Sequence, residues 1–390
     1  MHDMKTFYIK TYGCQMNVHE SQKIHKLLES EGYIQAESED KTDIIIFNTC
    51  TVRNTAEEKI TSHIGNAHKE KRDGRNLILA IVGCLSQRDG VSKSLMKKFP
   101  QLDIILGTHN ISEIGAAIEN ASRKQKTIEI VKERKLNPRF DNLTAPDDPT
   151  KPNTHYINIT YGCDNYCTYC IVPYVRGRVV NREITEIESE FIKLFNSIKD
   201  REESQIIYLL GQNVNSYICP KTNKNFIGLL EQLSGYIKNS NSKLNFLSSH
   251  PKDFSRELAD FIASAPEIER NIHLPIQNGC DKILKLMNRG YTVEDYKSKI
   301  NYLRKVCPDV KITTDIICGF PGESEDDFAD TINMVRDIKF NAAFIFPYSR
   351  RSGTAADKMS NQIDHKTKKA RTTELIKIQR EISNQITLGE

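Results

Sequence analysis

The sequence has no apolar segment as long as the ~18 residues that a membrane-spanning helix requires, so we expect no transmembrane helix. Its first residues, MHDMKTFYIKTYG, lack the basic start and the apolar stretch of a secretory signal, so we expect a cytoplasmic protein. Internal repeats and low-complexity segments are absent as well. The formal net charge of +4 is compatible with a nucleic-acid partner but does not predict one.

The first part of the chain alternates strand-like and helix-like segments. Apolar patterns predict strands over residues 5–13, 43–50, 76–84 and 102–108, and a helix over 21–32. Thr55 and Glu58 are placed to form a capping box for a second helix. This order predicts an α/β domain over residues 1–141 with a doubly wound parallel sheet. Residues 142–154, rich in proline, aspartate and asparagine, are expected to form a linker.

The second part, residues 155–390, alternates again over a longer course. Strands are expected over residues 155–161, 204–212, 243–249, 271–277, 311–320 and 342–349, with helical patterns between them. Six such units predict a partial (β/α)6 barrel of the TIM type. An amphipathic helix over 374–386 is expected near the end of the chain.

Three of the ten cysteines are close together in the sequence. Cys163, Cys167 and Cys170 form the pattern C-x3-C-x2-C directly after the first expected barrel strand. In a cytosolic chain such cysteines are more often metal ligands than disulfide partners. Three thiolates would leave one iron of an iron–sulfur cluster open to a further ligand. The alternative is a structural zinc site with a distant fourth ligand.

Three other cysteines stand alone in the sequence but share a position. Cys14, Cys50 and Cys84 each end an expected strand of the N-terminal sheet. Parallel strands end at one edge of a sheet, and open α/β sheets bind ligands at that edge. We therefore expect the three thiols to meet and to form a second site. The alternative is that they are three small buried residues.

The pattern C-x3-C-x-aromatic-C after the first barrel strand resembles the radical S-adenosylmethionine (SAM) superfamily. The resemblance implies a [4Fe-4S] cluster on Cys163, Cys167 and Cys170 that binds SAM and cleaves it to a 5′-deoxyadenosyl radical, with Tyr169 near the adenine. With the N-terminal cysteines, the whole pattern resembles the methylthiotransferase family, which implies a second [4Fe-4S] cluster. The segments TYGCQMN, NTCTVRNTAEEK, VPYVRGR and LLGQNVNSY are similar to its MiaB branch, the tRNA-2-methylthio-N6-dimethylallyladenosine synthases.

This resemblance implies a reaction that replaces a C–H bond with C–S–CH3 at C2 of N6-isopentenyladenosine next to the tRNA anticodon. Two SAM molecules are consumed, one as the methyl donor and one as the radical source. C2 is neither acidic nor a good electrophile, so the cofactors must carry the chemistry while the protein positions the reactants. No catalytic residue is expected beyond the cluster ligands.

The resemblance also implies SAM-binding residues outside the cysteines. The superfamily commonly binds the amino group of SAM after the second strand, where this chain has Gln212 and Asn213. The segment ICGFPGE is similar to the glycine-rich segment beside the adenine, which implicates Gly319 and Gly322. A tight turn into a capped helix is the alternative for these glycines.

The implied partners are tRNA, through its anticodon stem-loop, and an electron donor such as flavodoxin or ferredoxin, with the enzyme itself a monomer. Arg176, Arg178 and Arg182 form a basic stretch that is a candidate contact for tRNA phosphates, or an ordinary solvated surface. The family normally ends in a β-barrel RNA-binding domain, TRAM, which is expected to be absent here.

Two alternatives remain open from the sequence. The first is a methylthiotransferase that acts on threonylcarbamoyl-adenosine in tRNA or on a ribosomal protein side chain. The second is a non-catalytic RNA-binding protein whose cysteines hold zinc.

Overall fold

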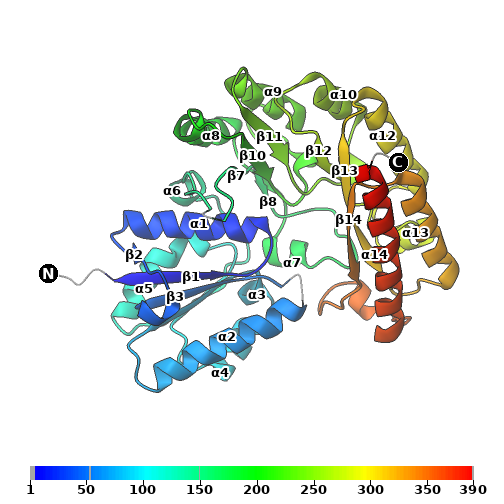
Figure 1. The fold of residues 1–390 in the computed structure, drawn as a ribbon. Coiled ribbons are helices and arrows are strands. Elements are labelled where there is room, and N and C mark those ends of the chain that lie inside the picture. The colour runs from blue at the N-terminus through cyan, green and yellow to red at the C-terminus, as the bar shows by residue number, and fades with distance from the viewer. Residues whose placement is uncertain (1–4, 52–53, 149, 389–390) are drawn as a thin grey trace. The chain divides into compact units, whose positions relative to one another are not determined.

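The structure is a computed structural model that describes residues 5–51, 54–148 and 150–388, the side chains of 54–59 excepted (Figure 1). The capping box expected at Thr55 and Glu58 lies outside the described side chains. The chain divides into two compact units, Met1–Gly162 with Ile171–Ser197, and Cys163–Cys170 with Ile198–Glu390. Residues 171–197 thus belong to the first compact unit. The domain boundary expected at 142–154 stays a prediction.

The first unit contains a parallel sheet of six strands in the order β2-β1-β3-β4-β5-β6. Its strands are β1 (Thr6–Thr11), β2 (Ile34–Gln35), β3 (Ile44–Thr49), β4 (Ile78–Gly83), β5 (Ile104–Leu106) and β6 (Thr127–Glu129). All four predicted strands are present. The outer strands β2 and β6 were not predicted, because two or three residues are too few to show a period of alternation.

Helices cover both faces of this sheet, and Figure 1 shows α1 on one side and α2 and α4 on the other. Their bounds are α1 (Gln15–Ser30), α2 (Asn54–Arg72), α3 (Cys84–Gln87), α4 (Val91–Lys98) and α5 (Ile114–Ser122). Along β3, Ile44 and Ile46 pack with α1 and α5, whereas Ile45 and Phe47 pack with α2 and α4. Both faces of the strand are therefore buried, which explains its continuous apolar run and confirms the doubly wound sheet.

The helix predicted at 21–32 begins earlier, at Gln15, directly after Cys14. Its first turns carry polar residues that are nevertheless buried, among them Asn17, His19 and Glu20. Hydrophobic periodicity could not detect these turns, because their buried face is polar.

The later segments of the first unit join α1 through buried charges. They are α6 (Pro138–Asp141), β7 (Thr154–Asn158), β8 (Thr160–Tyr161), α7 (Val172–Arg176), β9 (Val180–Asn181) and α8 (Ile184–Ile198). The Glu190 carboxylate lies 3.2 Å from Lys23 Nζ and 2.6 Å from Arg182 Nη1, and all three side chains are inaccessible to solvent. Lys23 also donates to the carbonyl of Asp141 at 2.5 Å. Buried charges that satisfy one another in this way fix α8 and β9 to α1.

The second unit alternates strands and helices as predicted. Its strands are β10 (Gln205–Leu210), β11 (Ser242–Phe246), β12 (Asn271–His273), β13 (Lys311–Cys318) and β14 (Ala342–Pro347). Its helices are α9 (Phe226–Ile237), α10 (Arg256–Ser264), α11 (Asp281–Leu286), α12 (Val293–Val306), α13 (Glu325–Ile338) and α14 (His365–Leu388). β10 pairs with β11, and β12, β13 and β14 pair in that order, all in parallel. Short 3-10 helices complete the chain at Glu39–Lys41, Ile111–Glu113, Val214–Ser216, Pro251–Asp253 and Ala356–Lys358.

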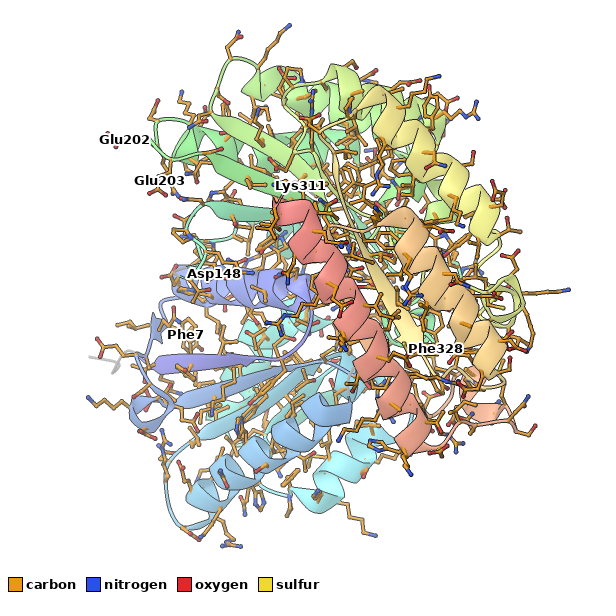
Figure 2. All side chains as sticks on the ribbon, turned by 45° about the vertical axis from the view of Figure 1, so that its right-hand side comes forward. Phe7, Asp148, Glu202, Glu203, Lys311 and Phe328 are labelled. Carbon is orange, nitrogen blue, oxygen red and sulfur yellow. The ribbon has the colours of Figure 1, made fainter. Side chains whose placement is uncertain are left out.

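Figure 2 labels one core residue in each unit, Phe7 on β1 and Phe328 on α13. Phe328 is buried, and the guanidinium of Arg371 on α14 lies 5.5 Å from its ring centroid. α14 starts well before the predicted residue 374, because its first turns are polar and show no apolar repeat. Across the described ranges, no helix combines the length and apolar character that crossing a bilayer demands.

His19 gives the first unit a testable pH dependence. It is fully buried, and burial, with Lys23 and Arg182 nearby, lowers its pKa well below the ordinary value. As the pH falls below about 6.5, the unfolded chain therefore binds a proton that the folded chain does not. We predict that His19→Leu gains stability relative to the parent chain by ~1.4 kcal/mol per pH unit below that point. Urea unfolding at pH 7.0 and 5.5 measures the free energy of unfolding of the parent chain and of His19→Leu. An equal loss of stability in the two chains between these pH values would contradict the prediction.

Candidate cysteine sites

The sheet register brings Cys14, Cys50 and Cys84 to one edge of the first unit. Thr49 pairs with Gly83, so Cys50 and Cys84 follow directly opposed residues. On the other side of β3, Thr11 pairs with Asn48, and Cys14 lies just beyond this pair. The three cysteines therefore leave neighbouring strands at the same level, as their positions predicted. Their role as cluster ligands stays a prediction at this point.

Two glycines allow this close approach. Gly13 has φ +131°, and a Cβ added there would lie 2.6 Å from Cys50 Cβ. Gly83 has φ +99°, and a Cβ there would lie 2.6 Å from the carbonyl oxygen of Thr49. Both conformations are ones that side chains with a Cβ avoid. Gly13 and Gly83, each directly before a cysteine at the start of a helix, thus let Cys14 and Cys84 follow strand ends that lie close to the neighbouring strand.

The sheet order also marks this edge as a ligand site. Chain order reverses between β1 and β3, so the helices that follow these two strands cover opposite faces. Such a reversal opens a crevice outside the carboxyl ends of the strands, which is where open α/β sheets bind ligands. Cys14 and Cys50 lie on either side of this reversal.

Buried polar groups hold the loop around Cys14. The side-chain amide of Asn17 donates to Asn48 Oδ1 and to the Thr49 carbonyl, both at 3.1 Å. In return, Asn48 Nδ2 donates to the Asn17 carbonyl at 2.9 Å, and Cys14 Sγ donates to Asn17 Oδ1 at 3.4 Å. These bonds fasten the first turn of α1 to the end of β3.

A buried ion pair lies beside Cys84. Arg176 on α7 donates to both carboxylate oxygens of Glu20, at 2.7 and 3.1 Å. Cys84 packs against Ile171 and Val175 of the same segment. Burial raises the pKa of Cys84 to about 12, against the opposing effect of the Arg176 charge. The VPYVRGR segment therefore completes the wall of the N-terminal cysteine site.

This position corrects the RNA-binding prediction for two arginines. Arg176 is 4% exposed and paired with Glu20, and Arg182 is 0% exposed and paired with Glu190. Neither can reach a phosphate without breaking a buried ion pair. Arg178, between them, is exposed, and its RNA contact stays a prediction.

The second unit holds Cys163, Cys167 and Cys170 in one loop. Cys163 and Cys167 are buried and Cys170 is partly exposed. The loop is fixed at Thr168, whose N–H donates to the Met287 carbonyl at 3.0 Å and whose carbonyl accepts from Ala356 at 2.8 Å. The loop is therefore held by two distant segments of its own unit.

Arg289 lies against this loop and was not singled out from the sequence. Its Nη1 lies 3.2 Å from Cys167 Sγ and 3.4 Å from the hydroxyl of Tyr169. Tyr169, expected near an adenine, thus has a hydroxyl within reach of a buried guanidinium. Burial raises the pKa of Tyr169 well above its ordinary value.

Unsatisfied polar atoms gather where β10 and β11 end. They are Asn213 Oδ1, Asn215 Nδ2, Ser249 Oγ and His250 Nε2, all buried and without a hydrogen-bond partner among the described residues. Burial, followed by the charges of Arg289, Lys252 and Lys299, lowers the pKa of His250 to about 2, so its ring is neutral. Buried polar atoms normally find partners, so such a group is suited to a polar ligand.

Three further predicted residues have clear positions. Gln212 follows β10 and is partly buried. Gly319 and Gly322 have φ of +71° and +84°, and the Gly319 N–H donates to buried Glu323 at 2.7 Å. A Cβ on Gly319 would lie 2.3 Å from Lys368 Cγ on α14. These contacts support the tight-turn alternative, and contact with an adenine stays a prediction.

Both cysteine sites have donors suited to an iron–sulfur cluster. None of the ten cysteines forms a disulfide. No three cysteine, histidine or carboxylate groups of the described ranges stand close enough to share a single metal ion. A [4Fe-4S] cluster does not require this, because each cysteine binds a different iron.

A basic pocket of about 370 Å³ opens in the second unit. It is lined by Lys252, Phe254, Ser255, Arg256, Gly290, Tyr291, Asp295, Ser298 and Lys299. Three cations face one carboxylate there, and that carboxylate, Asp295, accepts from the backbone of Thr292 at 2.9 Å. Lys252 also donates to Asn165 in the cysteine loop at 3.1 Å, so the pocket adjoins that loop.

Comparisons with known proteins agree with the two-part pattern. Residues 6–107 match a family described as Uncharacterized protein family UPF0004, and residues 157–335 match the Radical SAM superfamily. The chain is 42% identical over 383 residues to the tRNA-2-methylthio-N(6)-dimethylallyladenosine synthase of Natranaerobius thermophilus, which covers 98% of this chain and 82% of that enzyme. The enzyme of the same name from Carboxydothermus hydrogenoformans is 39% identical over 99% of this chain and 86% of its own length.

Solved structures share the fold. The radical SAM methyltransferase TsrM from Kitasatospora setae, with cobalamin and a [4Fe-4S] cluster bound, has a TM-score of 0.67 at 14% identity, over 90% of this chain and 76% of that chain. The cobalamin-dependent radical SAM enzyme OxsB has a TM-score of 0.61 at 12% identity, over 94% of this chain and 56% of its own. At such identities the likeness concerns the fold alone, and it confirms the predicted α/β architecture.

The buried ion pair beside Cys84 should contribute more to the free energy of unfolding than an exposed ion pair does. Glu20→Gln would leave the Arg176 guanidinium buried without its counter-charge, which costs about 3 kcal/mol of unfolding free energy. Asp309→Asn removes the partner of Arg270 from a more exposed pair and should cost about 0–1 kcal/mol. Urea unfolding of both variants measures the two losses. Equal losses would contradict the importance of the buried pair.

Proposed function

The chain belongs to the methylthiotransferase family of radical SAM enzymes, and on this premise we propose that it is a tRNA-2-methylthio-N6-dimethylallyladenosine synthase. The reaction adds a methylthio group to C2 of N6-isopentenyladenosine next to the anticodon of tRNA. The observation that carries the proposal is the identity of 42% over 98% of the chain. The two separate cysteine sites support it.

The enzyme uses two [4Fe-4S] clusters and S-adenosylmethionine. When bound, these groups supply the hydrogen abstraction and the methylthio group that an unreactive C–H bond requires. We assign one cluster to Cys163, Cys167 and Cys170 and the other to Cys14, Cys50 and Cys84. Each set offers three thiols outside any disulfide with a buried guanidinium nearby, Arg289 for the first and Arg176 for the second.

The protein itself orients SAM through polar groups of the second unit. We assign this role to Asn213 and His250, whose side chains carry buried unsatisfied atoms at the ends of β10 and β11. Asn213 is fixed by its bond from Nδ2 to Asp253 at 2.6 Å, which leaves its Oδ1 free to accept from an ammonium group. His250 is neutral, because its pKa is about 2, so it does not repel that cation.

The basic pocket is our candidate for contact with tRNA. Arg176 and Arg182 are committed to internal ion pairs, so phosphate contacts must come from elsewhere. Lys252 and Arg256 are exposed in the pocket, whereas Lys299 is held by the carbonyls of Pro251 and Phe254 at 2.6 and 2.9 Å. Lys252, which also donates to Asn165, and Arg256 are therefore the exposed side chains of the pocket that can meet a phosphate. A flavodoxin or ferredoxin as electron donor, and a monomeric enzyme, remain predictions.

Reconstitution with iron and sulfide tests the function directly. The chain, given SAM, a reductant and tRNA that carries isopentenyladenosine, should yield the 2-methylthio nucleoside by mass spectrometry. The variant with Cys14, Cys50 and Cys84 changed to alanine should still cleave SAM but make no product, and Cys307→Ala should match the parent chain.

Other results would favour other functions. Product only on threonylcarbamoyl-adenosine or on a ribosomal protein would shift the substrate assignment. Stoichiometric zinc without sulfide after anaerobic purification would instead support a non-catalytic RNA-binding protein.

The tRNA contact predicts a change in salt dependence. Each phosphate contact contributes ~0.7–0.9 to the slope of log K against log salt concentration. Lys252→Ala and Arg256→Ala should each weaken binding of an anticodon stem-loop and lower that slope by about one such contact. Lys311→Ala is the control, because Lys311 is exposed at the amino end of β13 (Figure 2). An unchanged slope in all three variants would show that the pocket does not contact tRNA.

A further inference from the structure

Arg289 is a buried cation without an acidic partner. It is 4% exposed, and its partners are Cys167 Sγ, the hydroxyls of Tyr169 and Tyr291, and the carbonyl of Pro275. Among the described residues, no carboxylate pairs with it. An isolated charge is strongly unfavourable in a protein interior, so a negative group must balance it. Of its partners, the Cys167 sulfur is the one that would carry negative charge as a ligand of an iron–sulfur cluster.

The local backbone is shaped to present this side chain. Asn288 and Gly290, on either side of Arg289, have φ of +59° and +70°. Asn288 holds the cysteine loop, because its Nδ2 donates to the carbonyls of Asn165 and Tyr166, both at 3.2 Å. Glycine and asparagine are the residues that most readily adopt left-handed backbone, so both positions suit this turn. The turn therefore fixes both the loop and the guanidinium that faces it.

The N-terminal cysteine site differs in charge. Its buried arginine, Arg176, is already neutralised by the two bonds to Glu20. The two sets of thiols therefore lie in different electrostatic surroundings. The N-terminal set lies beside a neutralised ion pair, and the set in the second unit lies beside a cation with no carboxylate partner in the described ranges.

We propose that Arg289 is the counter-charge of the cluster on Cys163, Cys167 and Cys170 and raises its reduction potential. A hydrogen bond to a ligand sulfur and a nearby positive charge both stabilise the reduced cluster, which carries one more electron than the oxidised one. The electron comes from a one-electron donor, and no bond or proton of Arg289 changes. The inference rests on the proposed function, because it requires a cluster at this loop.

The test is the midpoint potential of this cluster, followed by electron paramagnetic resonance during titration with dithionite. It uses the full chain with Cys14, Cys50 and Cys84 replaced by alanine, so that one cluster is present. Arg289→Met should make reduction at least tenfold less favourable, which is 59 mV for one electron. Arg289→Lys keeps the charge without the planar fork and should shift the potential less. Arg304→Met is the control, because within the described part of the chain Arg304 donates to the carbonyls of Ile338 and Lys339 and to no cysteine.

The outcomes distinguish a failure of the inference about Arg289 from a failure of the proposed function. A lower potential in Arg289→Met alone supports the inference, and so does loss of the cluster from Arg289→Met with its retention in Arg289→Lys. Equal potentials in the parent and both Arg289 variants would overturn it, as would the same shift in Arg304→Met. A parent chain that takes up no iron and sulfide would overturn the proposed function instead.

Discussion

The hydrogen-bonded register of β1, β3 and β4 is the constraint on which the N-terminal site depends. It sets three strand ends at one level, and the glycines before Cys14 and Cys84 let those ends touch without a Cβ between them. A shift of one residue would move each thiol to the other face of its strand. The buried amides of Asn17 and Asn48 hold this register at the strand ends, where fraying would otherwise begin.

Charge distinguishes the two cysteine sites more than geometry does. Each has one buried arginine, yet Arg176 is balanced by Glu20 and Arg289 is balanced by no carboxylate among the described residues. A cluster that must accept an electron at very low potential benefits from an uncompensated cation, because the reduced state is the more negative one. The uncompensated guanidinium of Arg289 therefore lies at the site that the resemblance links to SAM cleavage, whereas Arg176 at the other site is already neutralised.

Much of the fold could be predicted, because its inner strands are buried on both faces and read as continuous apolar runs. The short outer strands β2 and β6 could not, and neither could the first turns of α1, whose buried residues are polar. The burial of Arg176 and Arg182 could not be predicted for a related reason, whereas Arg178 between them is exposed. Sequence alone shows three arginines near one another, whereas Glu20 and Glu190 draw two of them into the interior.

The sequence by itself determined the cysteine spacing, the alternation of strands and helices and the family, since all of these depend on local patterns. Tertiary structure alone decided which charges meet. Arg176 finds Glu20 across 156 positions, and Arg289 finds Cys167 across 122. A guanidinium is identical in the sequence whether it faces solvent, a carboxylate or a sulfur. Only folding assigns its partner, because burial makes an unpaired charge too unfavourable to persist.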